Sequence, residues 1–247
     1  MRIAVAGGTG LVGSMVVDRV GAAGHEVVVL ARSRGVDLVR GTGLEEGVLA
    51  DVGAVIDVTN LTTLSARRSA AFFTAVSQNL LAAGDRAGVA HHVALSIVGV
   101  NRAPYGYYAG KRAQERLVER GPLPWTILRA TQFHEVAKIA YDTAHIGPLH
   151  LAPRMRIQPV AASEVAAQLV DLATGTPADS VVETAGPRTE ALDAMIKEYA
   201  WAIGSRSWIP TVSLPGALGR AQRDGTLLPQ ADVVLAEQTF ADWLRDL

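Results

Sequence analysis

The sequence predicts an α/β fold built on an open, doubly wound parallel sheet. Three observations lead to this prediction: short runs rich in valine and isoleucine alternate with longer segments of helical periodicity, most of these runs are near-continuously apolar, and the alternation continues to about residue 175. Strands that are apolar along their whole length are typical of parallel sheets, because helices cover both faces of such sheets. A chain of 247 residues is long enough for a single domain of this class.

The expected elements follow this alternation in order. The predicted strands are residues 3–6, 26–30, 54–58, 92–97, 126–128 and 181–184, and the predicted helices between them are residues 11–23, 66–87, 107–120 and 163–173. Ser163 is expected to cap the start of the last helix. Gly175 stands just past its end, where glycine commonly terminates a helix.

The pattern changes after Gly186 and Pro187. A helix is predicted over residues 191–203, an extended piece over residues 208–214, and helical segments from there to the end of the chain. This part holds three of the four tryptophans, Trp201, Trp208 and Trp243. We expect these large side chains to pack the segment onto the sheet as a small lobe.

We therefore predict one domain over residues 1–247, with a core over about residues 1–175 and a C-terminal lobe over about residues 186–247. Doubly wound sheets bind ligands beyond the carboxyl ends of their strands. A lobe beside those ends is predicted to face the substrate.

Composition narrows the classes of function. The chain carries 23 Lys and Arg against 24 Asp and Glu, a formal net charge of -1. This balance provides no basic field of the kind that binds nucleic acid or acidic membranes, and we expect neither partner. No stretch reaches the ~18 uninterrupted apolar residues of a membrane span, and the absence of cysteine excludes disulfides and thiolate catalysis. We expect a cytoplasmic protein that binds a small-molecule substrate.

A glycine-rich turn follows the first predicted strand and opens the first predicted helix. Gly7, Gly10 and Gly13 form the pattern G-x-x-G-x-x-G. Glycine here lets the backbone approach a pyrophosphate at a helix N-terminus, and the last glycine lets helix and strand pack closely. A P-loop would need a Lys-Ser/Thr pair, which is missing, and a purely structural turn is the alternative. The context predicts a Rossmann-type dinucleotide site with contacts from Gly7, Thr9, Gly10, Leu11, Val12 and Gly13.

The end of the second predicted strand indicates which dinucleotide is bound. An acidic residue there accepts the ribose hydroxyls of NAD, whereas this chain has Arg32, Ser33 and Arg34. A guanidinium pairs well with a 2′-phosphate, so we predict NADP(H), with Arg32 as the main determinant and Ser33 and Arg34 as helpers. The alternative is that these arginines are solvated loop cations.

A hydroxyl, a phenol and an ammonium form the candidate catalytic set. Ser96 ends the fourth predicted strand, and Tyr107 and Lys111 lie four residues apart on the next helix, so they share one face. A phenol is a weak acid unless a nearby cation stabilises its phenolate, which Lys111 is expected to do while Ser96 holds a carbonyl oxygen. Ser96 and Lys111 are also expected to contact the dinucleotide, and for Lys111 a hydrogen bond to the nicotinamide ribose is a rival role. Tyr107 is alternatively a surface aromatic without chemistry.

Together with residues 57–60 and 125–134, these motifs resemble the short-chain dehydrogenase/reductase superfamily, in particular its atypical, NmrA-like NAD(P)-binding branch. The resemblance covers about residues 1–175. It implies that Thr59 and Asn60 lie beside the adenosine ribose. It also implies that a second segment, made of Ala130, Thr131, Gln132 and Phe133, passes the nicotinamide. The chain departs from the family where Arg40-Gly41-Thr42 replaces the usual Gly-Asp, which puts an adenine contact in doubt.

Other polar residues are weighed separately. His134 is predicted to line the substrate pocket beside the nicotinamide. No metal is expected, because no histidines stand at ligand spacing. Asp57 is unusual inside an apolar strand, since a buried carboxylate must be paired or neutralised, and the sequence names no partner for it.

The main hypothesis is an NADPH-dependent oxidoreductase that reduces a carbonyl or similar group of a small organic substrate. One alternative is a regulatory protein that binds NADP(H) and senses redox state without turnover. Another is an epimerase-type enzyme that retains its dinucleotide through each cycle. The fold by itself does not distinguish among them.

Overall fold

The computed structural model describes residues 1–45, 47–103, 105–230 and 232–247. The chain forms two compact units. The first comprises Met1–Arg129 and Ser163–Val182, and the second comprises Ala130–Ala162 and Glu183–Leu247. Residues 130–162, which the sequence placed in the core, thus join the C-terminal residues in the second unit.

The first unit is built of long, regular elements. They are β1 (Arg2–Ala6), α1 (Leu11–Ala22), β2 (Glu26–Leu30), the 3-10 helix η1 (Arg32–Arg34), β3 (Val52–Asp57), α2 (Ala66–Ala87), β4 (His91–Ile97) and α3 (Tyr107–Glu119). Three further elements contain residues of both units: β5 (Trp125–Ala130), α5 (Ala162–Thr174) and β10 (Ser180–Ala185). Each predicted strand and helix of the core is present within a few residues of its expected bounds.

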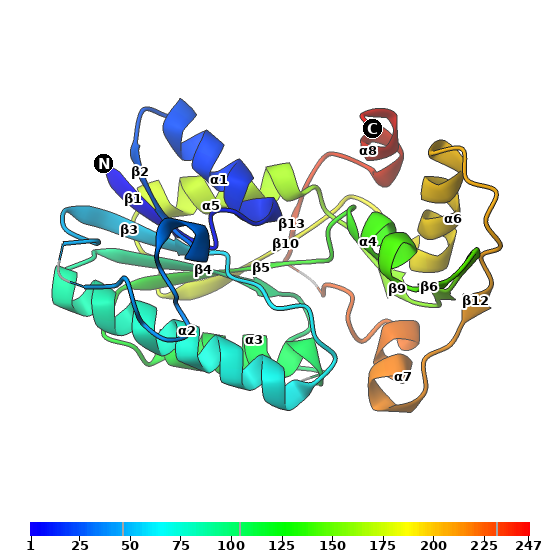
Figure 1. Ribbon diagram of the computed structural model, residues 1–247, viewed down its shortest axis with the longest axis horizontal. Coiled ribbons are helices and arrows are strands. Elements are labelled where there is room, and N and C mark those ends of the chain that lie inside the picture. The colour runs from blue at the N-terminus through cyan, green and yellow to red at the C-terminus, as the bar shows by residue number, and fades with distance from the viewer. Residues whose placement is uncertain (46, 104, 231) are drawn as a thin grey trace. The chain divides into compact units, whose positions relative to one another are not determined.

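Seven strands form the main sheet in the order β13-β10-β5-β4-β3-β1-β2, where β13 is Val234–Leu235. The pairs of β1 with β2, β1 with β3, and β3 with β4 are all parallel. In the first unit, α1 and α5 cover one face of the sheet and α2 and α3 the other (Figure 1). The predicted doubly wound α/β fold is confirmed.

The core of the first unit explains the apolar strands. Leu30 of β2, Val55 of β3 and Leu80 of α2 are fully buried in one cluster. Burying a side chain of this size contributes roughly 1.5–3 kcal/mol relative to leaving it exposed. Because helices cover both faces of the sheet, a side chain in the middle of β1 or β3 cannot reach water, and these positions are apolar. Asp57, at the end of β3, is buried although it is charged, and its hydrogen-bond partners are found in the candidate site.

Helix ends in this unit follow local chemistry, with one difference from expectation. The hydroxyl of Ser65 accepts from the amide of Arg68 and caps α2. Ser163 was predicted to cap α5, but the helix begins one residue earlier, at Ala162, so Ser163 lies in its first turn. The amide of Gly175 donates to the carbonyl of Asp171 and ends the same helix as predicted.

The second unit is built of short elements. Its helices are α4 (Val136–Thr143), α6 (Leu192–Ala202), α7 (Gly216–Asp224) and α8 (Phe240–Arg245). Its short strands are β6 (His145–Ile146), β7 (Leu149–His150), β8 (Ala152–Pro153), β9 (Arg156–Ile157), β11 (Glu190–Ala191), β12 (Thr211–Val212) and β13. The predicted helix over residues 191–203 corresponds to α6, whereas α4 was not predicted.

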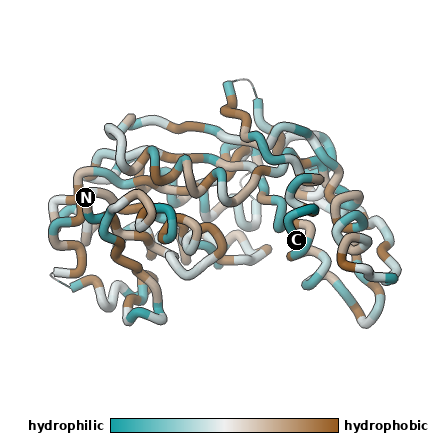
Figure 2. The backbone as a smooth tube through the Cα atoms, turned by 90° about the horizontal axis from the view of Figure 1, so that it is seen from above, coloured by the Kyte–Doolittle hydropathy of each residue, from teal (hydrophilic) through white to brown (hydrophobic). Residues whose placement is uncertain are grey.

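Hydropathy varies over short distances along the backbone. In Figure 2 the apolar stretches, drawn in brown, are short and interrupted by polar residues. Among the residues that the structure describes, no helix combines the length and the apolar character that crossing a membrane requires.

Candidate functional site

The glycine turn sits at the carboxyl ends of β1, β2 and β3. The amide of Gly7 donates to the carbonyl of Leu30 at the end of β2 over 3.0 Å, and the amide of Gly10 donates to the carbonyl of Gly7 over 3.0 Å. Gly7 has a φ of 82°, which L side chains rarely adopt, and a Cβ there would lie 3.1 Å from the backbone of Thr59. A Cβ on Gly13 would overlap the carbonyl oxygen of Gly7. The turn is therefore closed to side chains at two of the three glycines of the motif, Gly7 and Gly13.

The helix that leaves this turn has an open N-terminus. Gly10 is the N-cap residue of α1, no side chain caps the helix, and its first turn holds no acidic residue. The first amides of a helix lack partners within the helix and carry partial positive charge, so an uncapped N-terminus favours an anion. Backbone without side chains at an open helix N-terminus fits the pyrophosphate of a dinucleotide.

The predicted determinants of NADP(H) lie next along the chain. Arg32, Ser33 and Arg34 form the exposed helix η1, directly after the strand end that the amide of Gly7 contacts. Within the described ranges, no ion pair engages Arg32 or Arg34. Both guanidinium groups thus remain available to a phosphate in solution.

The end of β3 supplies the partners that Asp57 needs. Its Oδ1 accepts from the amide of Thr59 over 2.9 Å and from the hydroxyl of Thr59 over 2.7 Å. Its Oδ2 accepts from Nε2 of Gln114 over 2.7 Å. Asp57 and Gln114 are fully buried, while Asn60, two residues beyond Val58, is exposed. The carboxylate therefore fixes the strand end at which the resemblance puts the adenosine ribose.

Lys111 is buried and fully hydrogen bonded, with only 3% of the residue exposed. Its Nζ donates to the carbonyl of Leu95 over 2.8 Å, to Oε1 of Gln114 over 2.9 Å and to the carbonyl of Thr59 over 3.3 Å. An ammonium has three N–H donors, and three acceptors engage them. A hydrogen bond to a ribose would require one of these contacts to open. Burial lowers the pKa of Lys111 to about 8, against the opposing effect of the Asp57 and Glu115 carboxylates.

Tyr107 and Lys111 lie on one face of α3, and both contact the same aromatic ring. The ring of Phe73, from α2, packs edge-on against Tyr107 at 5.7 Å between centroids, and Nζ of Lys111 lies 4.3 Å from the centroid of the same ring. Burial raises the pKa of the Tyr107 phenol above its ordinary value, and the Tyr108 phenol and the Asp57 carboxylate raise it further. We expected Lys111 to lower the pKa of Tyr107, whereas the surroundings of Tyr107 raise it.

Two small residues set the position of Tyr107. A Cβ on Gly110 would overlap the hydroxyl of Ser69, so glycine allows α3 to approach α2 closely. The Ser69 hydroxyl donates to the carbonyl of Tyr107 over 2.9 Å. The first turn of α3 is thus tied to α2 at the residue that bears the phenol.

Ser96 lies at the carboxyl end of β4, two strands away from β1 in the sheet. Its residue is 5% exposed, and its hydroxyl has no hydrogen-bond partner among the described residues. Buried polar groups are usually paired. An unpaired hydroxyl at the ligand-binding edge of a parallel sheet is suited to hold an oxygen of a bound molecule.

The segment assigned to the nicotinamide belongs to the second unit. Ala130 ends β5, and Thr131 donates from its amide to the carbonyl of Thr184 over 3.1 Å and from its hydroxyl to the carbonyl of Gln158 over 2.5 Å. Gln132 and Phe133 are partly exposed. Their predicted contact with the nicotinamide stays a prediction.

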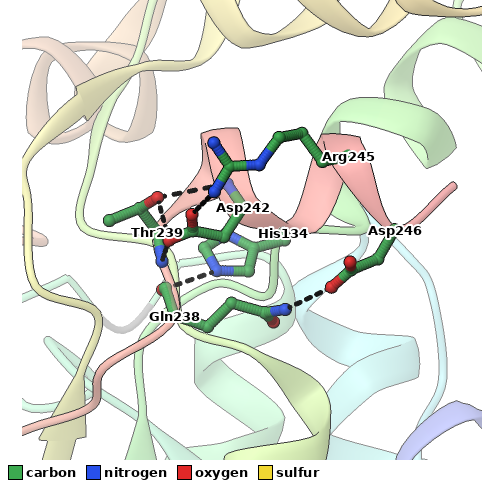
Figure 3. A network of polar contacts seen from close by, with 6 residues as sticks. All are labelled: His134, Gln238, Thr239, Asp242, Arg245 and Asp246. Atoms are coloured by element: carbon green, nitrogen blue, oxygen red, sulfur yellow. Dashed lines mark hydrogen bonds and ion pairs between the residues drawn. The ribbon is translucent and has the colours of Figure 1, made fainter.

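His134 is fully buried in the second unit, beneath the C-terminal helix α8. Its Nε2 is 3.1 Å from the carbonyl oxygen of Gln238, and its ring lies 5.9 Å from Phe240 and 6.3 Å from Trp243. Figure 3 shows the ring beside the residues that open α8, where Thr239 and Asp242 form a capping box. These contacts favour a packing role, and the predicted contact with substrate stays a prediction.

Sequence reasoning missed the residues that organise the first unit's site. Gln114 and Phe73 determine the surroundings of Lys111, yet nothing local marks them, because each meets Lys111 or Asp57 only through the packing of α2 and α3 on the sheet. The one available signal was Asp57 itself, whose place in an apolar strand required a buried polar partner.

Comparison with known proteins agrees with this geometry. Residues 7–175, well over half of the chain, match a family model described as NAD(P)H-binding. No curated protein matches the chain.

Solved structures with this fold include both reductases and sugar-nucleotide enzymes. An NADPH-dependent quinone oxidoreductase, QOR2, from Escherichia coli, complexed with NADPH, has a TM-score of 0.71 and 17% identity over 99% of each chain. A NAD-dependent NDP-hexosamine 5,6-dehydratase, TunA, has a TM-score of 0.73 and 17% identity, covering 99% of this chain and 95% of its own. UDP-glucose 4-epimerase of Thermus thermophilus, in complex with NAD, has a TM-score of 0.70 and 19% identity, covering 85% of this chain and 86% of its own. At these identities the likeness concerns the fold.

Proposed function

Since the chain belongs to the NAD(P)H-binding family, we propose that it is an NADPH-dependent oxidoreductase that reduces a carbonyl or similar group of a small organic substrate. The family match and the parallel α/β sheet confirm the resemblance to the atypical short-chain dehydrogenase/reductases. The chain therefore binds a nicotinamide dinucleotide, and the choice of NADPH, the reaction and its substrate form the proposal.

The observation that carries the proposal is the unpaired, buried hydroxyl of Ser96. It lies at the carboxyl-terminal edge of the sheet, where the glycine turn also lies. An oxygen of the substrate would give it a partner.

Residues of this chain would supply hydrogen bonds and a proton. When bound, the dinucleotide supplies the hydride. Ser96 would hold the substrate oxygen, and Tyr107 would donate a proton to it as that oxygen gains charge. The raised pKa of Tyr107 keeps the phenol protonated at neutral pH, which is the form that a reduction requires.

A preference for NADPH is supported by the exposed cluster of Arg32, Ser33 and Arg34. A guanidinium can make two parallel hydrogen bonds to a phosphate. The ribose of NADH offers no such charge, so the cluster would favour the phosphorylated dinucleotide.

A dinucleotide sensor is the second candidate. The three internal contacts of Lys111 favour it, because they occupy the N–H donors of the ammonium that the expected catalytic set would use. It predicts tight binding of NADPH with no turnover. An epimerase-type reaction, as in some of the structural relatives, predicts conversion of a substrate without net consumption of NADPH.

The test is to measure binding of NADPH and NADH by calorimetry, and then to follow NADPH absorbance with a panel of carbonyls and quinones. We expect tighter binding of NADPH and its oxidation by at least one compound. Tyr107→Phe should lower kcat about a hundredfold, within the range for loss of a general acid, and leave dinucleotide affinity unchanged. Tyr105→Phe, at an exposed tyrosine of the same region, is the control and should keep full turnover. Full activity in Tyr107→Phe would remove the phenol from the proposal.

A further inference from the structure

We propose that Asp57, Gln114 and Lys111 form a buried positioning chain that fixes the ends of β3 and β4, and that Lys111 performs this role only as a charged ammonium. The inference rests on the dinucleotide site proposed above. It assigns Lys111 a task other than tuning the Tyr107 phenol. It also gives Gln114 a role that no motif in the sequence indicates.

The chain is continuous and buried. Oδ2 of Asp57 accepts from Gln114, and Oε1 of Gln114 accepts from Lys111, over 2.7 Å and 2.9 Å. Asp57 and Gln114 are fully buried and Lys111 nearly so. The amide orientation of Gln114 is thereby determined, because its NH₂ group meets a carboxylate and its oxygen meets an ammonium. Gln114 thus links a buried anion to a buried cation that do not touch directly.

Lys111 connects the buried side chains to the backbone at two strand ends. The carbonyl of Leu95 belongs to the peptide group that carries the amide of Ser96, and the carbonyl of Thr59 belongs to the peptide group that carries the amide of Asn60. One ammonium therefore holds together the strand end that bears the candidate catalytic hydroxyl and the strand end assigned to the adenosine ribose. A neutral amine has two N–H donors, so deprotonation would leave one of the three acceptors unpaired.

Thr59 connects the chain to the phosphate-binding turn. Its backbone lies where a Cβ on Gly7 would come within 3.1 Å, so Thr59 forms a wall of the turn. Its amide and hydroxyl are bound by Asp57, and its carbonyl is bound by Lys111. Release of the Lys111 contact would let this wall move and would weaken dinucleotide binding.

The charges that face Lys111 come from several elements. Asp57 on β3 and Glu115 on α3 favour the ammonium, while Arg129 on β5 pairs with Glu115 through two hydrogen bonds of 2.8 Å. On β4, His92 interacts electrostatically with Asp57. From α2, the uncharged ring of Phe73 packs against Nζ. Burial outweighs these attractions and puts the pKa of Lys111 at about 8, within reach of a titration on the folded protein.

The first test needs no substitution. The sequence contains three lysines, Lys111, Lys138 and Lys197, so carbon-13-labelled lysine gives three resolvable side-chain signals. We expect one signal to titrate near pH 8 and its midpoint to move upward when NADP⁺ is added, because binding and protonation are reciprocally coupled. NADPH affinity should correspondingly fall above that midpoint, by up to about tenfold per pH unit for one linked proton. A midpoint that NADP⁺ leaves in place or lowers would overturn the proposal.

Variants at Gln114 separate the chain from direct contact of Lys111 with the ligand. Gln114→Leu removes an acceptor from Lys111 and should lower the pH midpoint of NADPH affinity. Gln114→Glu keeps an acceptor for Nζ and, protonated toward the Asp57 carboxylate, should keep the midpoint close to that of the wild type. Lys138→Met, at an exposed lysine of α4, is the control and should reproduce the wild-type profile. Equal midpoints in the two Gln114 variants and the wild type would contradict the chain. Because the readout is binding, absence of turnover would refute the oxidoreductase proposal and leave this result interpretable.

Discussion

The two compact units of the chain use their buried polar groups differently. In the first unit, Asp57 and Lys111 are bound to the backbone at strand ends, around the turn that receives the dinucleotide. In the second unit, buried polar groups connect short segments to one another: the hydroxyl of Tyr141 bonds to the hydroxyls of Ser205 and Ser207 over 2.6 Å and 3.1 Å.

The difference shows that buried polar side chains have a different role in each unit. Long parallel strands satisfy their own backbone, so the first unit can devote buried charges to the ligand-binding edge. The second unit has seven strands of two residues each, so side chains must hold its segments in place. Substitutions in the first unit are therefore expected to alter binding, and those in the second unit to alter local stability.

The largest expected effect is at Gly13. Gly13→Ala would place a Cβ against the carbonyl oxygen of Gly7, and the turn would have to move away from the helix. We expect NADPH affinity, measured by calorimetry, to fall more than about a hundredfold, because the overlap is with backbone and should cost at least the upper end of the ~1–3 kcal/mol that is typical of overpacking. Gly21→Ala in the same helix meets no atom within 4 Å and should retain affinity. Comparable affinities in the two variants would show that the turn is not closed to side chains.

His134 tests the second unit. His134→Ala removes a fully buried ring from beneath α8 and leaves the carbonyl of Gln238 without that contact. We expect hydrogen exchange in α8 to lose about 2–4 kcal/mol of protection, as for other large buried side chains, while exchange in α2 is unchanged. Trp201→Ala, at a side chain that is 84% exposed, should change neither region. Retained protection of α8 would instead favour the predicted role of His134 in the substrate pocket.

Arg32 tests the source of selectivity between dinucleotides. Arg32→Ala should weaken NADPH binding about tenfold to a hundredfold, because a hydrogen bond to a charged group contributes about 1.5–3 kcal/mol, and it should leave NADH binding unchanged. Arg34→Ala should have a smaller effect. Competition between the two dinucleotides measures both. An unchanged preference in Arg32→Ala would remove this residue as the determinant.

His92 offers the smallest effect, on stability rather than binding. Burial lowers its pKa below the ordinary 6.5, and among the described residues neither ring nitrogen has a hydrogen-bond partner. Above pH 6.5 the histidine is neutral in both the folded and unfolded states. Below that pH the unfolded state takes up a proton that the folded state resists, so the free energy of unfolding falls.

The fall should not exceed about 1.4 kcal/mol per pH unit for this one group. Urea titrations from neutral to mildly acidic pH should show a shallower dependence in His92→Phe than in the wild type. His145→Asn, at an exposed histidine of the second unit, should not change the slope. An identical slope in His92→Phe would exclude the buried imidazole as its source.

Prediction from sequence succeeded where structure is set locally. The strands β1 to β4 and the helices α1, α2 and α3 were found because uniform burial leaves an apolar run and a helix leaves a 3.6-residue period. The glycine turn could also be predicted, since each position that has no room for a Cβ requires glycine, whatever the rest of the sequence is.

Prediction stopped where contacts join distant residues. Gln114 is 57 positions from Asp57, and Phe73 contacts Tyr107 and Lys111 only after α2 packs on α3. The spacing of Tyr107 and Lys111 correctly put them on one helix face, but it could not show which acceptors Lys111 would meet. In the second unit, two-residue strands and the eight-residue helix α4 are too short to leave a periodic signal.

The central claim is that this chain transfers hydride between NADPH and a substrate. NADPH with both hydrogens on the reactive carbon of its nicotinamide replaced by deuterium tests it most directly, with a carbonyl compound found active in the screen, because the carbon of the resulting alcohol keeps the label. We predict that the label appears in the released product, together with stoichiometric NADP⁺, and that Ser96→Ala slows the transfer more than it weakens NADPH binding. Tight binding with the label retained on the dinucleotide for every compound would contradict the claim and identify a binding protein.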